Sequence, residues 1–409
     1  MRGRPHLFTS YEGEQSLLPT WTQRVMLALF LVLLVTIPLQ FVPGVQFLGS
    51  DSWLLVLNRV MIYAIGALGI NILTGLAGQV SLGHAFFMGI GAYTAVVLGA
   101  PASDRFWGMG LPIWIWLPAA GIVAAIVGII VAPTAVRVRG LYLAIVTLGL
   151  VFIGEHLFRN LTFITGGAGL GRDWPELAFR FWKEEEPLID FSSRGPWFGI
   201  EFSGAAKTYF FMLVLLILFT LWHKNLARTR IGRAFQSIRD RDIAAEVMGV
   251  ADAKNKLRAF AISSFFAGVA GALLGALVGR LVPETWNLLL SVQFVAIILI
   301  GGAGTTAGTL LGSFFVVAIP RMVEDLTRML SVQVRTDGPF AWLGDFIIAD
   351  QGDFGLVSTV ANGPGLSIFQ TNLALYGFLI IIFLIFEPLG LFGVWIRIRN
   401  YWKGWPFSY

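Results

Sequence analysis

Long apolar runs recur along the chain and constrain its fold more than any other feature. A helix needs about 20 apolar residues to cross a bilayer, and only helices or closed barrels satisfy their backbone groups in lipid. Barrel strands would alternate in polarity over about ten residues, whereas these runs are continuous and longer. The sequence therefore predicts an all-α polytopic membrane protein with about ten transmembrane helices, at residues 22–42, 53–74, 82–100, 112–132, 140–158, 206–223, 259–281, 287–302, 308–328 and 368–388.

Composition agrees with a membrane protein. Hydrophobic residues make up 56% of the chain and charged residues 13%, about half the charged fraction of a soluble protein. The net charge of +5 could suit nucleic acid, but the basic residues concentrate between spans, so we expect no nucleic-acid partner. The chain has no cysteine, which excludes disulfides and cysteine-ligated metals. The first apolar run lacks a small-residue cleavage site, so we expect no cleavable signal peptide.

A basic island at residues 224–258 fixes the expected orientation. Nine basic side chains face four acidic ones there: Lys224, Arg228, Arg230, Arg233, Arg239, Arg241, Lys254, Lys256 and Arg258 against Asp240, Asp242, Glu246 and Asp252. Loops rich in Lys and Arg stay on the cytoplasmic side. We therefore expect a cytoplasmic N-terminal extension (1–21), a transmembrane domain (22–388) and a cytoplasmic C-terminal tail (389–409).

The same assignment places loops 159–205 and 329–367 outside. Both loops carry more acidic than basic residues near their centres, which agrees with an external location. The first contains Trp174, Trp182 and Trp197 beside prolines, and we expect it to form a small cap near the membrane surface. Either loop could be connecting structure or a docking surface for an external partner.

Three glycine-rich segments interrupt or border the predicted spans: Gly75–His84, Gly301–Gly308 and Thr165–Gly169. Such breaks can serve close helix packing by small residues. They can also present backbone polar groups to a substrate pathway, as transporters do with broken helices. The candidate pathway residues are Gly75, Gly78, Gln79, Ser81, His84, Thr165, Gly166 and Gly167.

Ionisable residues inside the predicted spans are few, and such residues usually face protein or water. Glu155 and Arg159 are spaced i,i+4, so they share one helix face and can pair. This pair could be structural or could meet a substrate. His84 could be a hydrogen-bonded packing residue or a proton relay, and the former is the expectation.

Residues 232–250 within the island have helical spacing. Ile231, Phe235, Ile238 and Ala245 fall on one apolar face, with charges over much of the remainder. Gly249 suits a helix C-terminus. Such a helix could lie on anionic lipid or dock into a groove of a cytoplasmic partner.

No sequence signature of catalysis is present. The chain has no G-x-x-x-x-G-K-[ST] loop for ATP phosphates, no cysteine or histidine cluster for a metal, and no G-x-S-x-G elbow. We therefore expect no enzyme activity and no cofactor, and we expect that this chain does not itself bind ATP in the usual way.

Several segments together resemble the LivM-type permease subunits of branched-chain amino-acid ABC importers. Residues 243–249 are similar to the EAA-type loop of ABC importer permeases, with Ile243 where the general motif has Glu. The other matching segments are Asn71–His84, Arg139–Leu148, Glu155–Gly169, Lys256–Leu273, Gly301–Gly308 and Glu387–Pro388. The N-terminal extension and the long 329–367 segment depart from the family pattern.

The resemblance implies a subunit of the bacterial plasma membrane that forms the translocation pathway with a second, homologous permease. Two cytoplasmic ABC ATPase subunits and an extracytoplasmic solute-binding protein would complete the importer. By this resemblance the residues that couple to the ATPase are Phe235, Ile238, Ile243, Ala244, Ala245 and Gly249. The expectation that follows is that Phe235→Asp abolishes transport without preventing insertion, and that Gly78→Leu blocks transport or assembly.

The solute stays open at this point. Branched-chain amino acids are the default for such a subunit, and urea or short amides are carried by related permeases. From other classes, a self-contained secondary carrier or channel would work without ATPases, and a membrane-embedded enzyme would need convergent acid, base or metal-binding residues.

Overall fold

The computed structural model of the chain describes residues 21–40, 46–138, 140–175, 177–182, 187–197 and 199–335, with short stretches between 348 and 404. Its main helices are α2 (Trp21–Thr36), α3 (Asp51–Ile70), α4 (His84–Gly99), α5 (Ile113–Arg137), α6 (Leu141–Asn160), α7 (Thr162–Thr165), α8 (Gly204–Arg228), α9 (Arg230–Val247), α10 (Asp252–Val278), α11 (Leu288–Gly301), α12 (Thr306–Arg335) and α15 (Gly390–Gly404). Shorter helical turns are η1 (Ile37–Leu39), η2 (Gln46–Gly49), the π-helix η3 (Asn71–Leu76) and η4 (Pro283–Thr285).

Among the described residues, 8 helices are long and apolar enough to cross a membrane, and α4 is a shorter apolar helix. Each predicted span up to 308–328 coincides with one of these helices. The tenth predicted span, 368–388, lies largely outside the described residues. The expected total of ten is therefore not reached in the part of the chain that the structure describes.

The helices extend beyond the apolar runs that predict them. Helix α8 continues through Arg228 and α10 begins at Asp252, so most of the predicted loop 224–258 is helical. Helix α12 likewise continues to Arg335, into the predicted external loop 329–367. The physical reason is that hydropathy locates the part of a helix that suits lipid, whereas backbone hydrogen bonding carries the helix on into charged residues.

Helix α10 lies at the centre of the bundle and packs against α5, α4 and α3. The approach to α4 is close because glycines face each other: a side chain on Gly91 would collide with the backbone of Gly268, and one on Gly271 with the backbone of Met88. Small residues let transmembrane helices pack at this short range. Helix α2 is different, because most of its surface is exposed. The Tyr209 hydroxyl of α8 donates a hydrogen bond of 3.0 Å to its Leu34 carbonyl.

Short strands modify the all-α prediction locally. They are β1 (Arg172–Asp173), β2 (Ala178–Phe179), β3 (Ile189–Asp190), β4 (Gly195–Trp197), β5 (Ile200–Phe202), β6 (Arg280–Leu281), β7 (Ile348–Ala349), β8 (Val357–Ser358) and β9 (Leu366–Ser367). The pairs β1–β6, β2–β3 and β4–β5 are antiparallel, and β7–β8–β9 form a parallel sheet. The predicted cap 159–205 thus contains the short strands β1 to β5 as well as α7.

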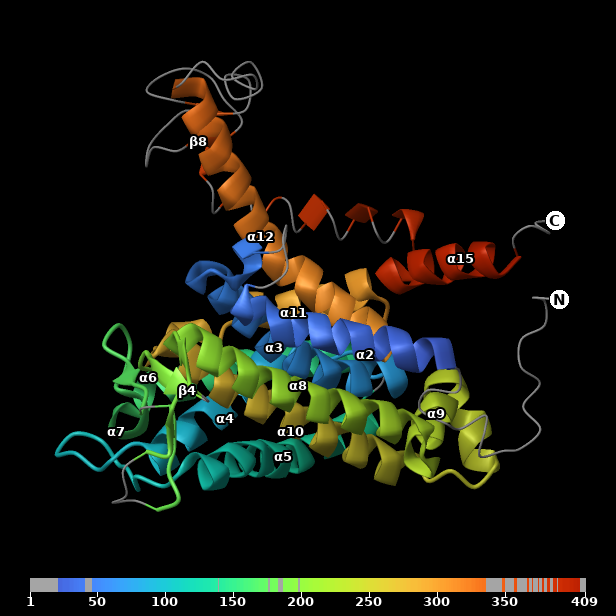
Figure 1. Cartoon of the computed structure of the whole chain (residues 1–409). Coiled ribbons are helices and arrows are strands. Elements are labelled where there is room, and N and C mark those ends of the chain that lie inside the picture. The colour runs from blue at the N-terminus through green and yellow to red at the C-terminus, as the bar shows by residue number, and fades with distance from the viewer. Residues whose placement is uncertain are drawn as a thin grey trace.

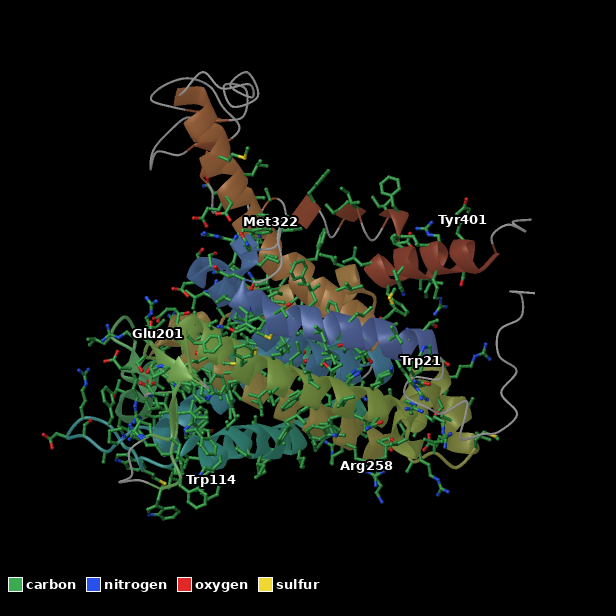
Figure 2. The ribbon with its side chains drawn as sticks, viewed as in Figure 1. Trp21, Trp114, Glu201, Arg258, Met322 and Tyr401 are labelled. Atoms are coloured by element: carbon green, nitrogen blue, oxygen red, sulfur yellow. The ribbon has the colours of Figure 1, made fainter. Side chains whose placement is uncertain are left out.

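The described elements separate into two ends (Figure 1). Helix α9, the start of α2 and α15 lie toward one end, which we call the α9 end. Helix α7 and strand β4 lie at the opposite end, called the α7 end. Figure 2 shows Trp21 and Arg258 toward the α9 end, and Glu201 and Trp114 toward the α7 end.

Candidate functional site

The first predicted break is present between α3 and α4. Helix α3 passes into the π-helix η3, and residues 77–83 are non-helical before α4 begins at His84. A helix of the 16 residues in α4 is about 24 Å long at 1.5 Å per residue, which is less than the hydrocarbon thickness of about 30 Å. Helix α4 alone is therefore shorter than the hydrocarbon layer, and the non-helical segment 77–83 precedes it.

Side chains accept hydrogen bonds from part of the backbone of this segment and of the first turn of α4. The Leu82 amide donates to Thr147 Oγ1 at 2.9 Å, and the Ala85 amide donates to Ser291 Oγ at 3.0 Å. The Gly83 amide donates to Ser81 Oγ at 3.2 Å. Non-helical backbone is tolerated at membrane depth when protein groups replace water in this way. Ser81 thus acts on the backbone of its own segment.

Gln79 and His84 carry buried polar atoms without partners. Gln79 is 6% exposed, and neither its Nε2 nor its Oε1 has a hydrogen-bond partner among the described residues. His84 is 2% exposed and its Nε2 also lacks a described partner, while its ring lies 4.9 Å from that of Phe294. Unpaired buried polar groups are costly. A hydrogen bond from water or from a polar solute would therefore be favourable at these atoms.

The second break, between α11 and α12, lies directly against the first. The Gly304 amide donates to Asn71 Oδ1 at 2.7 Å, and Asn71 Nδ2 donates to the Thr305 carbonyl at 3.3 Å. A side chain on Gly75 would also collide with the Gly304 amide. Gly304 has φ of +83°, a conformation that glycine adopts without steric cost. Two breaks distant in sequence therefore form one part-buried junction.

His223 of α8 extends this junction. Its Nε2 lies 3.3 Å from Asn71 Nδ2, and its Nδ1 lies 3.0 Å from Thr306 Oγ1. Because an amide nitrogen only donates, Nε2 accepts here and the ring proton is on Nδ1. His223 is 0% exposed. The ring therefore joins α8 to both breaks in its neutral form.

Arg239 of α9 contacts the same junction from the surface. Its Nη1 donates a hydrogen bond to the Gly75 carbonyl in η3. A methyl group on Gly78, where φ is +69°, would lie 3.0 Å from Arg239 Cγ, and one on Gly304 would lie 2.8 Å from Arg239 Nη1. The guanidinium and its stem thus pack on glycine backbone from both breaks, where any larger residue would displace them.

Helix α9 is kinked, whereas the helical spacing of residues 232–250 had predicted one continuous helix. Arg241 has φ of −157° and ψ of 98°, which are not helical. Phe235 (0% exposed), Ile238 and Ala245 are buried in the chain itself, so those three predicted coupling residues do not present a free surface to a partner. Gly249 follows the helix C-terminus with φ of +87°, as predicted.

The end of α9 exposes large apolar side chains. Ile243 is 67% exposed, Val247 82% and Met248 84%. Ala244 is also exposed. Of the predicted coupling residues, Ile243 and Ala244 therefore lie on the surface. Val247 and Met248 were not predicted, although they are neighbours in the same motif.

Thr165, Gly166 and Gly167 lie at the α7 end, away from the junction of the two breaks (Figure 1). Thr165 Oγ1 donates to the Phe158 carbonyl at 2.7 Å, and the Gly167 amide donates to Thr165 Oγ1 at 3.2 Å. The Arg172 guanidinium donates to the Ile164 carbonyl nearby, at 3.0 Å. The eight predicted pathway residues are thus separated into a junction group (Gly75, Gly78), a buried group (Gln79, Ser81, His84) and this turn at the α7 end.

Glu155 and Arg159 form an ion pair on α6, with Arg159 Nη2 2.7 Å from Glu155 Oε1. Arg159 Nε also lies 4.0 Å from Glu284 Oε1. Their side chains are partly exposed, as are Phe152 and Ile153 on the same helix. Within the described residues, no group of three or more His, Cys, Asp or Glu side chains could hold a metal ion.

Asn71, His223 and Arg239 were missed as junction residues by the sequence reasoning. A signal for two of them was available, since Asn71 and His223 are polar residues inside apolar runs, and such residues usually face protein or a polar cavity. Arg239 gave no separate signal because it is one of nine basic residues in its island.

Apolar spans, interrupted helices and polar groups gathered at the breaks define a multi-pass membrane permease. The chain belongs to the family of permease components of branched-chain amino acid transport systems, whose profile matches residues 52–349. It is therefore a protein of the bacterial inner membrane that is built, like its relatives, as a permease subunit.

Three relatives illustrate the similarity. The high-affinity branched-chain amino acid transport system permease protein LivM of Escherichia coli (strain K12) is 34% identical over 332 residues, covering 78% of this chain and 74% of LivM. LivM of Salmonella typhimurium is 33% identical over 317 residues, covering 76% and 70%. The autoinducer 2 import system permease protein LsrC of Enterobacter sp. is 33% identical over 141 residues, covering 33% and 37%. No solved structure matches the chain.

Proposed function

We propose that this chain is one of two homologous permease subunits of an ATP-driven importer, with two cytoplasmic ATPase subunits and an external solute-binding protein as its partners. The observation that carries the proposal is the form of α9. Before the kink, Phe235 and Ile238 are buried and Arg239 contacts the glycine junction, whereas the end of the helix exposes large apolar side chains. That arrangement suits a helix that transmits movements of the cytoplasmic ATPase subunits to the membrane spans.

The docking surface for the ATPase is formed by Ile243, Val247 and Met248. These large apolar residues are exposed beside Asp240, Asp242 and Glu246 in an otherwise charged segment. Exposed apolar residues on a polar background favour a protein partner that buries them in a groove. Basic residues dominate this end of the described bundle, which supports a cytoplasmic location.

Helix α6 is the proposed contact with the second permease. Glu155, His156 and Arg159 are partly or largely exposed on a helix that is apolar enough to span the membrane. Charged groups against lipid are costly and usually face protein or water. A second subunit facing α6 would shield them, and the solute would pass between the two subunits.

Gln79 and His84 are the proposed polar contacts along the pathway. Gln79 lies in the non-helical segment 77–83 and His84 is the first residue of α4, close in sequence to the junction that α9 contacts. The amide of Gln79 can both donate and accept, so it could pair with the carboxylate or the ammonium of an amino acid. Motion of the junction would then change access to these two groups.

The proposed solute is a branched-chain amino acid, because the relatives that cover most of the chain are named for that transport. Reconstitution tests the function. The chain would be placed in proteoliposomes with its genomic partners, and uptake of labelled leucine would be measured with and without ATP and the ATPase subunits. Uptake that requires both supports the proposal. Uptake by this chain alone along an ion gradient would instead indicate a secondary carrier, and selective uptake of urea would reassign the solute.

A further inference from the structure

We propose that Arg239 is a positioning residue that couples α9 to both glycine breaks at once, so that one movement of α9 shifts both. This inference rests on the function proposed above and goes beyond it, because it assigns the transmission of force to one side chain. It is carried by three contacts: a hydrogen bond to the Gly75 carbonyl and close packing on Gly78 and Gly304.

The Gly75 carbonyl is where such a contact has most effect. Gly75 lies in the last turn of the π-helix η3, where carbonyls lack partners further along the helix. A guanidinium that donates to such a carbonyl replaces the missing helical donor and carries a charge that the helix C-terminus favours. Removal of Arg239 would therefore leave the end of η3 without this bond.

Contact with Gly304 links the second break. Gly304 itself is held by Asn71, through the 2.7 Å bond from its amide to Asn71 Oδ1. Asn71 begins η3, and Gly75 lies one turn later in the same π-helix. The junction is thus a closed set of contacts in which η3, the second break and Arg239 each touch the other two.

The kink lies two residues beyond Arg239, at Arg241. The exposed residues Ile243, Val247 and Met248 follow the kink, whereas Phe235 and Ile238 precede it and are buried. A partner bound to the exposed end would therefore act across a hinge whose inner side is fixed by packing. Arg239 lies on that inner side, next to the hinge, and is placed to convey a displacement to the breaks.

The test uses the complete importer in proteoliposomes, with leucine uptake and ATP hydrolysis measured on the same samples. Arg239→Gln removes the guanidinium, Arg239→Lys retains the charge with a single donor group, and Arg230→Gln removes the same charge from an exposed position of the same helix. We expect Arg239→Gln to lower uptake per ATP at least about tenfold, as the loss of a charged hydrogen bond implies. We expect Arg239→Lys to be intermediate and Arg230→Gln to match the unmodified importer.

The outcomes separate this inference from the proposed function. If the unmodified complex shows no ATP-dependent uptake, the proposed function fails. If it does and Arg239→Gln keeps the normal uptake per ATP, or loses uptake and hydrolysis in equal proportion, the coupling role of Arg239 is wrong.

A second measurement needs no substitution. Hydrogen exchange of the unmodified complex is compared with and without bound ATP analogue. We expect residues 71–78 and 302–306 to change protection together with α9. A change in α9 that leaves both breaks unaltered would overturn the inference.

Discussion

Asn71 holds Gly304 across 233 residues of chain: its Oδ1 accepts the Gly304 amide at 2.7 Å. Asn71 begins the π-helix of the first break, and Gly304 lies in the turn of the second. This bond joins the two helix breaks, which could otherwise move independently of each other. The stability and the motion of the junction should therefore respond to the same side chain.

Replacement of Asn71 by Ala should destabilise the protein. The Gly304 amide would lose its partner in a part-buried site. The cost is at most that of an unsatisfied buried donor, about 1–3 kcal/mol. Thermal unfolding of purified protein in detergent measures the loss. Asn160→Ala is the control, because Asn160 is exposed and bonds within its own helix. Equal unfolding temperatures for the two variants would mean that the bond does not stabilise the junction.

Phe235 tests the inner half of α9. Its side chain is completely buried, so Phe235→Ala should cost about 3–5 kcal/mol, and Phe235→Asp would bury a carboxylate as well. The sequence-based expectation that Phe235→Asp spares insertion is therefore replaced by one of lowered folded yield. Size-exclusion chromatography and the unfolding temperature measure this. A stable, monodisperse Phe235→Asp protein would show that the inner half is not anchored in the bundle.

Val247→Asp tests the outer half of the same helix. Val247 is 82% exposed, so the stability of the isolated subunit should change by no more than about 0.5 kcal/mol. The carboxylate would, however, be buried against the ATPase and weaken assembly. Copurification of the ATPase subunits with Val247→Asp, compared with Val247→Ala, measures this. Full recovery of the ATPases with the Asp variant would place their docking surface elsewhere.

Gln79→Leu tests the buried group of the pathway. Both amide atoms lack a partner among the described residues, so an apolar side chain of similar size should leave the unfolding temperature unchanged or raise it. Uptake should fall, because a polar contact for the solute is lost. Initial uptake rates over a range of leucine concentrations separate a change in KM from one in maximal rate. Unaltered kinetics would remove Gln79 from the pathway.

Acid should weaken the cap through Asp190. Burial raises the pKa of this carboxyl, but hydrogen bonds from the side chains and backbones of Ser192 and Ser193 outweigh it and lower the pKa from 3.8 to about 2. A lowered pKa in the folded state contributes stability above the ordinary value, and this is lost as the pH falls from about 4 through about 2. Asp190→Asn should flatten the pH dependence of the unfolding temperature in that window. An unchanged profile would exclude Asp190 as its source.

Sequence reasoning located the spans and the breaks because their signals are local. An apolar run of about 20 residues has few alternatives in lipid, and Gly78 and Gly304 lie in glycine clusters that are visible in the chain. Helix ends were less predictable: α8 and α10 continue into charged residues that hydropathy excludes. The expected ion pair of Glu155 and Arg159 follows from spacing alone.

The composition of the junction could not be derived in this way. Whether Arg239 or Arg233 meets a glycine carbonyl depends on how α9 packs, which is a contact between distant segments. The kink at Arg241 has no local signature such as Pro or Gly. Beyond the kink, Ala245 is buried whereas Ile243 and Ala244 are exposed, a difference that depends on tertiary packing.

The central claim is that the exposed end of α9 docks onto the cytoplasmic ATPase subunits. One labelling experiment tests this claim most directly. The chain has no cysteine, so Met248→Cys introduces a single reactive site. A membrane-impermeant maleimide should label it in inside-out vesicles stripped of ATPase, should fail to label it in intact cells, and should lose access when the ATPase subunits are restored. Labelling of intact cells from outside, or no protection by the ATPase, would contradict the account.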